Sequence, residues 1–184
     1  MALDLQNADG KWIALHVRQR SESRVAALLS EGGYRSFLPL SQHNPQRVLF
    51  PGYIFCLFNS GVAFSLVRIP GVSGIVSFGG NVGTVSEDEI ESLKVIDRTI
   101  ADPQPWPYIS VGETVMITAG PLRGLTGYYV RESGRDRIVV SVTLLLRSVA
   151  LEVAREWIQS VPARKSFQLT APVARAAWPS SNCA

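Results

Sequence analysis

The chain has 184 residues, of which 46% are hydrophobic, enough for one large domain or two small ones. Only 18% of the residues are charged and the mean hydropathy is +0.14, so the composition excludes a chain that is disordered throughout. The apolar stretches, such as residues 53–58, are too short to cross a bilayer. The first ten residues are polar and acidic, so we expect no signal peptide, no membrane contact and a cytoplasmic location.

The net charge of +3 is unevenly distributed. Residues 1–103 carry a net charge of −1, residues 104–161 carry +1 and residues 162–184 carry +3. The part with a globular composition is therefore nearly neutral, unlike proteins that neutralise many nucleic-acid phosphates. Residues 18–68 contain six arginines and only two acids. This excess predicts a basic surface that suits an acidic protein at least as well as nucleic acid.

The first hundred residues contain strand and helix patterns in alternation. Residues 12–17 are apolar on both faces and predict a strand, and apolar residues spaced three and four apart predict a helix over 22–31. Further elements are expected in this order: a strand over 53–58, a short helix over 61–67 and a strand over 72–78.

The clearest local signal is a helix start at Ser86. Ser86 and Glu89 have the spacing of a capping box, in which each side chain binds the backbone N–H of the other residue. The helix is expected over about 87–99, with Ile90, Leu93 and Ile96 buried. The order β-α-β-β-α, with one more short strand, predicts an α+β domain over 10–101 in which helices cover one face of an antiparallel sheet.

Three prolines end this domain, because proline excludes helix and central strand. We expect residues 102–107 to form an extended connector. Residues 108–161 contain short β-rich runs divided by Gly and Pro, which predict a small all-β barrel, although 144–158 also suits a helix. Residues 162–184 are rich in Pro, Ala, Ser and Arg and predict a disordered tail.

The sequence lacks the pattern of a catalytic, metal or cofactor site. His16 and His43 stand far from cysteines and carboxylates at ligand spacing, and the glycines do not form a phosphate-binding loop. Cys56 lies in an apolar run and Cys183 in the tail, so there is no disulfide framework. We therefore expect a protein that binds partners, is not an enzyme and needs no cofactor.

A dense glycine pattern follows the strand expected at 114–118. It consists of Gly120, Pro121, Gly124 and Gly127, and it leads into the β-rich residues 137–140. The glycines would supply backbone conformations closed to other residues. This segment resembles the KOW motif of NusG-type transcription factors and of certain ribosomal proteins.

A second resemblance lies in residues 47–55. Phe50, Pro51, Gly52 and Tyr53 are similar to a segment of the NusG N-terminal domain, and Trp12 and the helix after Ser86 follow in the family's order. Together the resemblances cover about residues 10–160. They are nearest to the specialised paralogues, which include the RfaH type and the antiterminators of polysaccharide operons.

The resemblance implies a ferredoxin-like N-terminal domain followed by an SH3-like KOW barrel. It also implies that the first domain binds the clamp helices of the RNA polymerase β′ subunit through a pocket formed by Trp12, Phe50, Tyr53 and Ile54. Aromatic residues make such interface hot spots, whereas the alternative is that they fill the core, as we expect for Phe55. Three basic residues would meet acidic residues of the coiled coil or nearby DNA: Arg18, Arg20 and Arg24.

The implied function is that of a monomeric transcription elongation or antitermination factor, which disfavours paused polymerase by binding. The KOW domain would recruit a small-subunit ribosomal protein or the termination factor Rho, and contact with nascent RNA fits the same picture. Three alternatives stay open, of which one is a small enzyme with an unrecognised site. An RNA-binding or ribosome-associated KOW protein would bind naked RNA with a steep salt dependence. A KOW region that switches between barrel and helical hairpin, as in the RfaH type, would show helix at 144–158.

Overall fold

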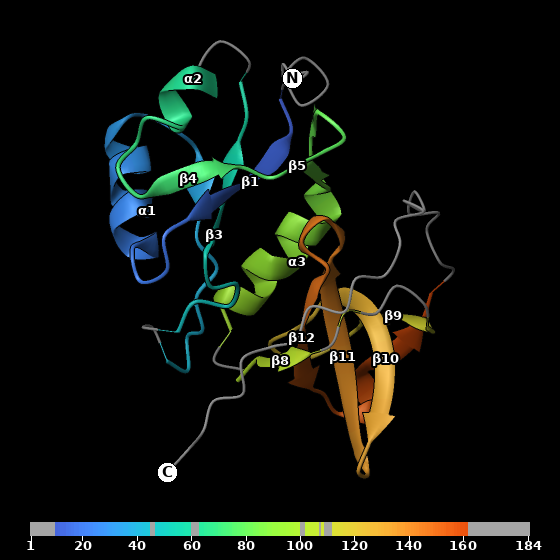
Figure 1. Cartoon of the computed structure of the whole chain (residues 1–184). Helices are drawn as coiled ribbons and strands as arrows, with labels where there is room; N and C mark the ends of the chain where they lie inside the picture. The colour runs from blue at the N-terminus through green and yellow to red at the C-terminus, as the bar shows by residue number, and fades with distance from the viewer. Residues whose placement is uncertain are drawn as a thin grey trace.

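The computed structural model describes residues 10–44, 47–59, 63–99, 102–106, 108 and 112–161. These residues form two antiparallel sheets, a separate two-stranded hairpin and three helices (Figure 1). The elements in chain order are β1 (Trp12–Val17), α1 (Glu22–Glu31), β2 (Ser36–Phe37), β3 (Tyr53–Leu57), α2 (Ala63–Leu66), β4 (Val72–Ile75), β5 (Ser77–Phe78), β6 (Asn81–Val82), β7 (Thr84–Val85), α3 (Glu87–Asp97), β8 (Gln104–Trp106), β9 (Thr114–Ile117), β10 (Thr126–Glu132), β11 (Arg135–Val142), the 3₁₀ turn η3 (Thr143–Leu145), β12 (Arg147–Glu152), the 3₁₀ turn η4 (Arg155–Trp157) and β13 (Ile158–Ser160). We call residues 10–99 the N-terminal part and residues 102–161 the C-terminal part.

The sheet of the N-terminal part has the strand order β2-β3-β1-β4, and β7 pairs with the start of β1. Side chains of β1 alternate between the faces: Ile13 and Leu15 pack in one cluster with α1, whereas Trp12 and Ala14 belong to the cluster that contains α3. The expectation that the helices cover one face is therefore wrong. The physical reason is β1 itself, because a strand that is apolar on both faces needs cover on both.

The local signals located the first elements closely. β1 and α1 have the expected bounds, and α3 begins directly after Ser86. The capping box is confirmed: the Ser86 hydroxyl accepts a hydrogen bond from the Glu89 N–H at 3.2 Å, and the Glu89 carboxylate accepts one from the Ser86 N–H at 3.0 Å. Ile90, Leu93 and Ile96 are buried as expected.

The strand expected over 72–78 is interrupted. β4 ends at Ile75, and β5 pairs with β6 in a separate hairpin. Gly79 and Gly80 connect the two strands with φ angles of 57° and 88°. Two successive residues with positive φ form the tight turn that suits a two-residue hairpin, so the glycines start a new pair of strands here.

The sheet of the C-terminal part has the order β13-β9-β10-β11-β12-β8. The proline-rich segment contributes β8, which lies at the sheet edge, where proline is tolerated. Residues 144–158 contain β12 with a 3₁₀ turn on either side rather than a helix. No helix in the described ranges is both long and apolar enough to cross a membrane.

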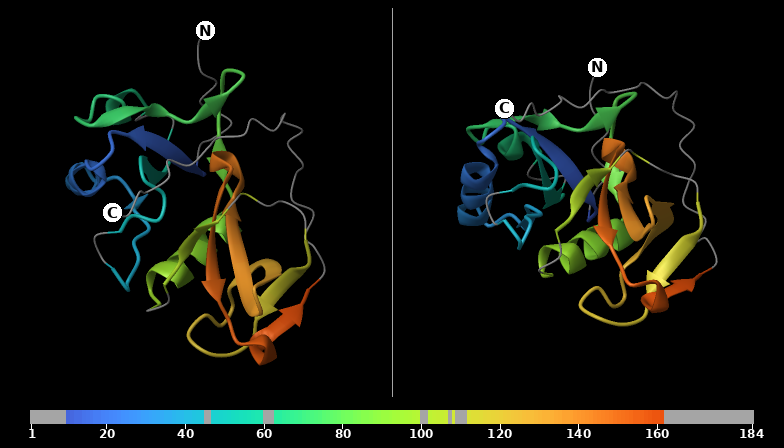
Figure 2. Two further views of the ribbon diagram at one scale, coloured as in Figure 1. Left: turned by 60° about the horizontal axis from the view of Figure 1, so that its bottom comes forward. Right: turned by 90° about the horizontal axis from the view of Figure 1, so that it is seen from below.

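The two sheets lie against α3 from different sides. Figure 2 shows α3 between the first sheet and strands β11 and β12. One buried cluster accordingly runs from β1 and β3 through α3 into the C-terminal part. This arrangement decides which side chains of the first sheet remain exposed.

Candidate functional site

An aromatic group lies on the face of the first sheet that α3 covers. Trp12, Phe50 and Phe55 are buried there in one cluster, and Tyr53 packs against it half-buried. The rings of Phe50 and Phe55 meet edge to face with centroids 6.0 Å apart. We call these four residues the aromatic face.

A turn before β3 positions two members of the aromatic face. The Tyr53 N–H donates to the Phe50 carbonyl at 3.1 Å and closes a four-residue turn around Pro51 and Gly52. Gly52 has a φ of 84°, the conformation that a type II turn requires after proline. The Phe-Pro-Gly-Tyr sequence thus encodes the local geometry that places Phe50 and Tyr53 three residues apart on one side.

Ile54 does not lie with the other three residues expected in the pocket. It is fully buried in the cluster that contains α1, on the opposite face of the sheet. The reason is the period of two in a strand, which sends neighbours to opposite faces. The same period brings Phe55, which we expected only in the core, to the aromatic face.

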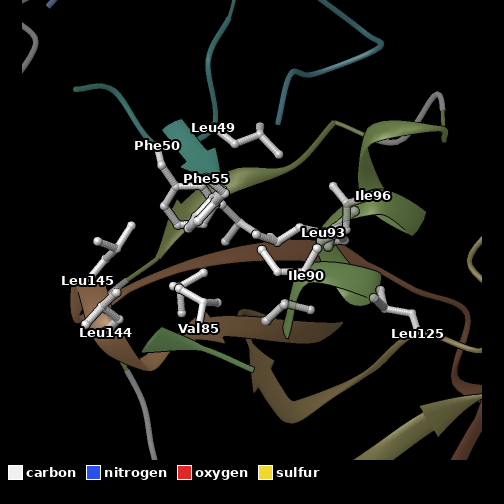
Figure 3. Packing of buried hydrophobic residues seen from close by; sticks show 14 of the residues in the cluster. Leu49, Phe50, Phe55, Val85, Ile90, Leu93, Ile96, Leu125, Leu144 and Leu145 are labelled. Carbon is white, nitrogen blue, oxygen red and sulfur yellow. The ribbon is translucent and has the colours of Figure 1, made fainter. Parts of the chain in front are cut away.

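Side chains of the C-terminal part close the aromatic face. Trp12 is 4% exposed and Phe50 is 1% exposed. Figure 3 shows leucines of both parts around Ile90 and Leu93, and Leu144 and Leu145 of η3 belong to the same cluster. Over the residues that it describes, the structure therefore shows no open pocket at the aromatic face. We call this arrangement, in which the C-terminal part covers the aromatic face, the closed form.

Gly83 provides the space for one of these leucines. A Cβ on Gly83 would lie only 2.2 Å from Leu144 Cδ1, and Leu144 is itself nearly buried. The absence of a side chain at residue 83 therefore lets η3 approach the link between β6 and β7. We call the contact between the two parts the seam.

Polar contacts also cross the seam. The Thr143 N–H donates to Glu89 Oε1 at 2.8 Å, so the carboxylate that caps α3 also binds the C-terminal part. Arg147 Nη1 donates to the Pro51 carbonyl at 3.2 Å, and its guanidinium lies 4.8 Å from the centroid of the Tyr53 ring. Arg147 thus reaches the turn that holds the aromatic face.

His16 lies beside the same contact. Its ring is 4.7 Å from the Tyr53 ring. Burial, and then the positive charge of Arg147, lower the pKa of His16 from its ordinary value of 6.5. The closed arrangement therefore favours neutral His16.

The KOW-like loop lies at the other end of α3. Gly120 has a φ of 75° and Gly124 a φ of 88°, as expected for positions closed to other residues. Gly127 is needed for space instead, because a Cβ there would lie 2.5 Å from the Val139 carbonyl oxygen. The Pro121 carbonyl lies 3.3 Å from the Thr99 hydroxyl, and the next residue in the loop, Leu122, is buried.

The expected basic residues are exposed but lie outside the aromatic face. Arg18 and Arg20 follow β1 and Arg24 lies in α1, and within the described residues none of the three forms an ion pair. The acid between them, Glu22, is buried and accepts a hydrogen bond from the Gly52 N–H at 2.9 Å.

The C-terminal part compensates most of its own positive charge. Four arginines form ion pairs with three acids: Arg131, Arg135, Arg137 and Arg155 with Glu132, Asp136 and Glu152. Among the described residues, no group of three His, Cys, Asp or Glu side chains could hold a metal ion.

Sequence reasoning missed three residues of the seam: Glu89 in its second role, Leu144 and Arg147. The only available signal was the apolar run Leu144 to Leu146 at the end of a strand. The two polar contacts of the seam join residues that are 54 and 96 positions apart in the sequence, and such distant pairs leave no local pattern.

Comparison with known families finds a match in the N-terminal part. Residues 10–94 match the family described as Transcription termination factor nusG. The N-terminal part is therefore similar to a NusG-family domain over almost its whole length.

Solved structures extend the likeness beyond residues 10–94. The structure described as "Domain interaction in Thermotoga maritima NusG" has a TM-score of 0.51 and 22% identity, over 83% of this chain and 97% of that chain. Two structures of the MjSpt4:Spt5 complex, in conformations B and A, have 19% and 20% identity, cover 84% and 83% of this chain and 99% of theirs, and have TM-scores of 0.32. A search of curated proteins found no match. The Thermotoga structure thus shows that the fold is shared across both parts of the chain.

Proposed function

We propose that the protein is a transcription elongation factor that binds RNA polymerase through its aromatic face. The match of residues 10–94 to the NusG family carries this proposal. The grouping of Trp12, Phe50 and Tyr53 on one face supports it, because aromatic side chains supply large contact areas at low entropic cost. The partner site is the helical hairpin of clamp helices in the β′ subunit, and no covalent chemistry is involved.

The indole N–H of Trp12 supports the proposal that the aromatic face also has a partner-bound state. It is buried and has no hydrogen-bond acceptor among the described residues. A buried donor without a partner is costly, so the closed form leaves this member of the aromatic face incompletely satisfied.

Binding at the aromatic face requires the C-terminal part to move away. We propose that residues 10–101 and 108–161 are separate domains, joined by a connector over 102–107. The tail expected over 162–184 lies outside the described residues. Polymerase then binds the open form, and its apparent affinity is reduced by the fraction of molecules that are open. Arg47 ties the connector to the first domain through Asp102, at 3.2 Å.

The C-terminal domain would recruit a further partner, a small-subunit ribosomal protein or Rho. Leu122 of the KOW-like loop is buried in the cluster that contains α3, whereas Pro121 is exposed, so opening would expose Leu122 as well. Arg18, Arg20 and Arg24 remain exposed for acidic polymerase residues or DNA. The finer role that we propose, from the ordered motifs, is that of a specialised antiterminator.

Binding of the full chain to core RNA polymerase tests the proposal. Leu144→Asp places a charge in the seam and should favour the open form, so we expect at least tenfold tighter binding than for the wild type. Tyr53→Ala in the Leu144→Asp background should lose most of this affinity, whereas Phe78→Ala, which removes an exposed ring elsewhere in the N-terminal part, should not.

Polymerase without the tip of the clamp helices is the control on the partner's side. Failure of the opened variant to bind intact polymerase would refute the proposed function. Steeply salt-dependent binding to naked RNA, without polymerase binding, would support the RNA-binding alternative.

A further inference from the structure

A groove beside the aromatic face stays open when the seam is closed. It has a volume of about 490 Å³, and its lining includes Trp12, Tyr34, Arg35, Phe37, Leu38 and Lys94. All of its lining residues belong to the N-terminal part, so the C-terminal part contributes nothing to its walls. The groove is thus a piece of the surface of the N-terminal part that needs no opening to be reached.

The groove is continuous with the aromatic face. Trp12 belongs to both, and the ring of Phe37 stacks 6.4 Å from the ring of Phe55. A partner that lies in the groove is therefore already next to the face that the seam covers.

The charges of the groove favour an acidic partner. Its lining contains Arg35 and Lys94 and no acid. Arg35 is exposed and forms no ion pair with the described residues. Lys94 Nζ lies 5.3 Å from the centroid of the Trp12 ring and 2.6 Å from Glu91, which is exposed. A surface ion pair of this kind is weak, so a carboxylate of a partner can take the place of Glu91.

The position of the groove at a short sheet edge favours a helix over a strand as its occupant. The groove lies at β2, the edge of the first sheet, where the free edge is only two residues long. Strand addition would have little backbone to pair with, whereas a helix can lay apolar side chains on Phe37 and Leu38 and an acidic one between the cations.

We infer that this groove is the first docking site for an acidic, apolar-faced helix of the polymerase partner while the aromatic face is still covered. The inference rests on the proposed function. Docking in the groove holds the helix beside the seam, so that each spontaneous opening is followed by capture of the aromatic face. Because complementary charge acts chiefly on association rates, the groove sets how fast the closed protein binds.

Stopped-flow association of the full chain with core RNA polymerase, over a range of salt concentrations, tests the inference. For Arg35→Glu combined with Lys94→Glu, we expect an association rate at least tenfold below that of the wild type at low salt, with a weaker salt dependence. Arg98→Glu, a matched charge reversal just after α3 and outside the groove, should keep the wild-type rate. Lys94→Arg should keep it too, and thermal melting checks that all variants are folded.

The opened Leu144→Asp background separates first docking from final binding. There the double reversal should slow association by less than threefold, because the helix reaches the aromatic face directly. An unchanged rate in the closed protein, or an equal loss in both backgrounds, would overturn the first-docking role while polymerase binding itself stands. If neither the wild type nor Leu144→Asp binds polymerase, the proposed function fails instead.

Discussion

Phe50 has a different place in the closed form from the one that its motif suggests. Its ring is 1% exposed and packs against Phe55. From the sequence, the resemblance predicts that Phe50 is an interface residue. In the closed structure it is part of a core that both halves of the chain complete, and Tyr53, half-buried under Arg147, is the better probe of binding alone.

Truncation of Phe50 should therefore destabilise the protein. We expect Phe50→Ala to lower the free energy of unfolding by about 3–5 kcal/mol, because it removes a fully buried ring and leaves a cavity. Urea denaturation of the full chain measures this, with Phe78→Ala, at a position 55% exposed, as the control. A loss below about 1 kcal/mol for Phe50→Ala would mean that the ring is not held in the cluster.

Gly127 allows a separate test at the residue scale. A Cβ at residue 127 would meet the backbone of β11, which cannot move aside as a side chain can. We expect Gly127→Ala to lower the free energy of unfolding by about 1–3 kcal/mol. Gly74→Ala is the control, because a Cβ there meets nothing within 4 Å. Equal stability of the two variants would contradict the close approach of β10 and β11.

At the scale of elements, α3 has a role in both parts of the chain. Its buried residues pack in the cluster that joins the two sheets. Glu89 caps the helix with Oε2 and receives the Thr143 N–H with Oε1. The start of this helix therefore affects both the stability of the N-terminal part and the closure of the seam.

Two substitutions separate these roles of the cap. Ser86→Ala should cost about 1 kcal/mol of stability and leave the seam closed, because it removes only the capping hydroxyl. Glu89→Ala should also shift the protein towards the open form, because it leaves the Thr143 N–H without its acceptor. Fluorescence transfer between dyes on the two parts reports closure. The dual role is wrong if Glu89→Ala and Ser86→Ala show the same transfer efficiency.

At the scale of the whole molecule, one equilibrium between the closed and open forms of the seam controls the exposure of two surfaces. These are the aromatic face and the part of the KOW-like loop at Leu122. Leu144 against Gly83, Glu89 with Thr143, and Arg147 on the Tyr53 turn hold the parts together from separate elements. The cluster between them is apolar, as expected for a contact with the character of a core.

Closure should depend on pH through His16. Its pKa is lowered in the closed form, so the open form binds the extra proton more readily. Closure is therefore fully supported above the ordinary pKa of 6.5 and weakens as the pH falls through and below that value. We expect energy transfer between the two parts to decrease from pH 8 to pH 6. His16→Gln should abolish this decrease, whereas His43→Gln should not, and a decrease that survives His16→Gln would assign the effect to another group.

The sequence by itself determined the local elements and the family pattern. The bounds of β1 and α1, the capping box at Ser86 and the turn before Tyr53 depend on residues within a few positions of one another. Patterns of that range survive in a single sequence, because the backbone of a short segment responds to its own side chains.

Only the tertiary structure decided how the pieces cover one another. Three features depend on which apolar surfaces meet. They are the placement of α1 and α3 on opposite faces, the presence of Phe55 rather than Ile54 on the aromatic face, and the closure of that face. The hydrophobic effect is non-directional, so the identity of an apolar residue does not indicate which residues it will contact in the folded protein. Arg147 and Pro51 are 96 residues apart, and only the folded chain brings them into contact.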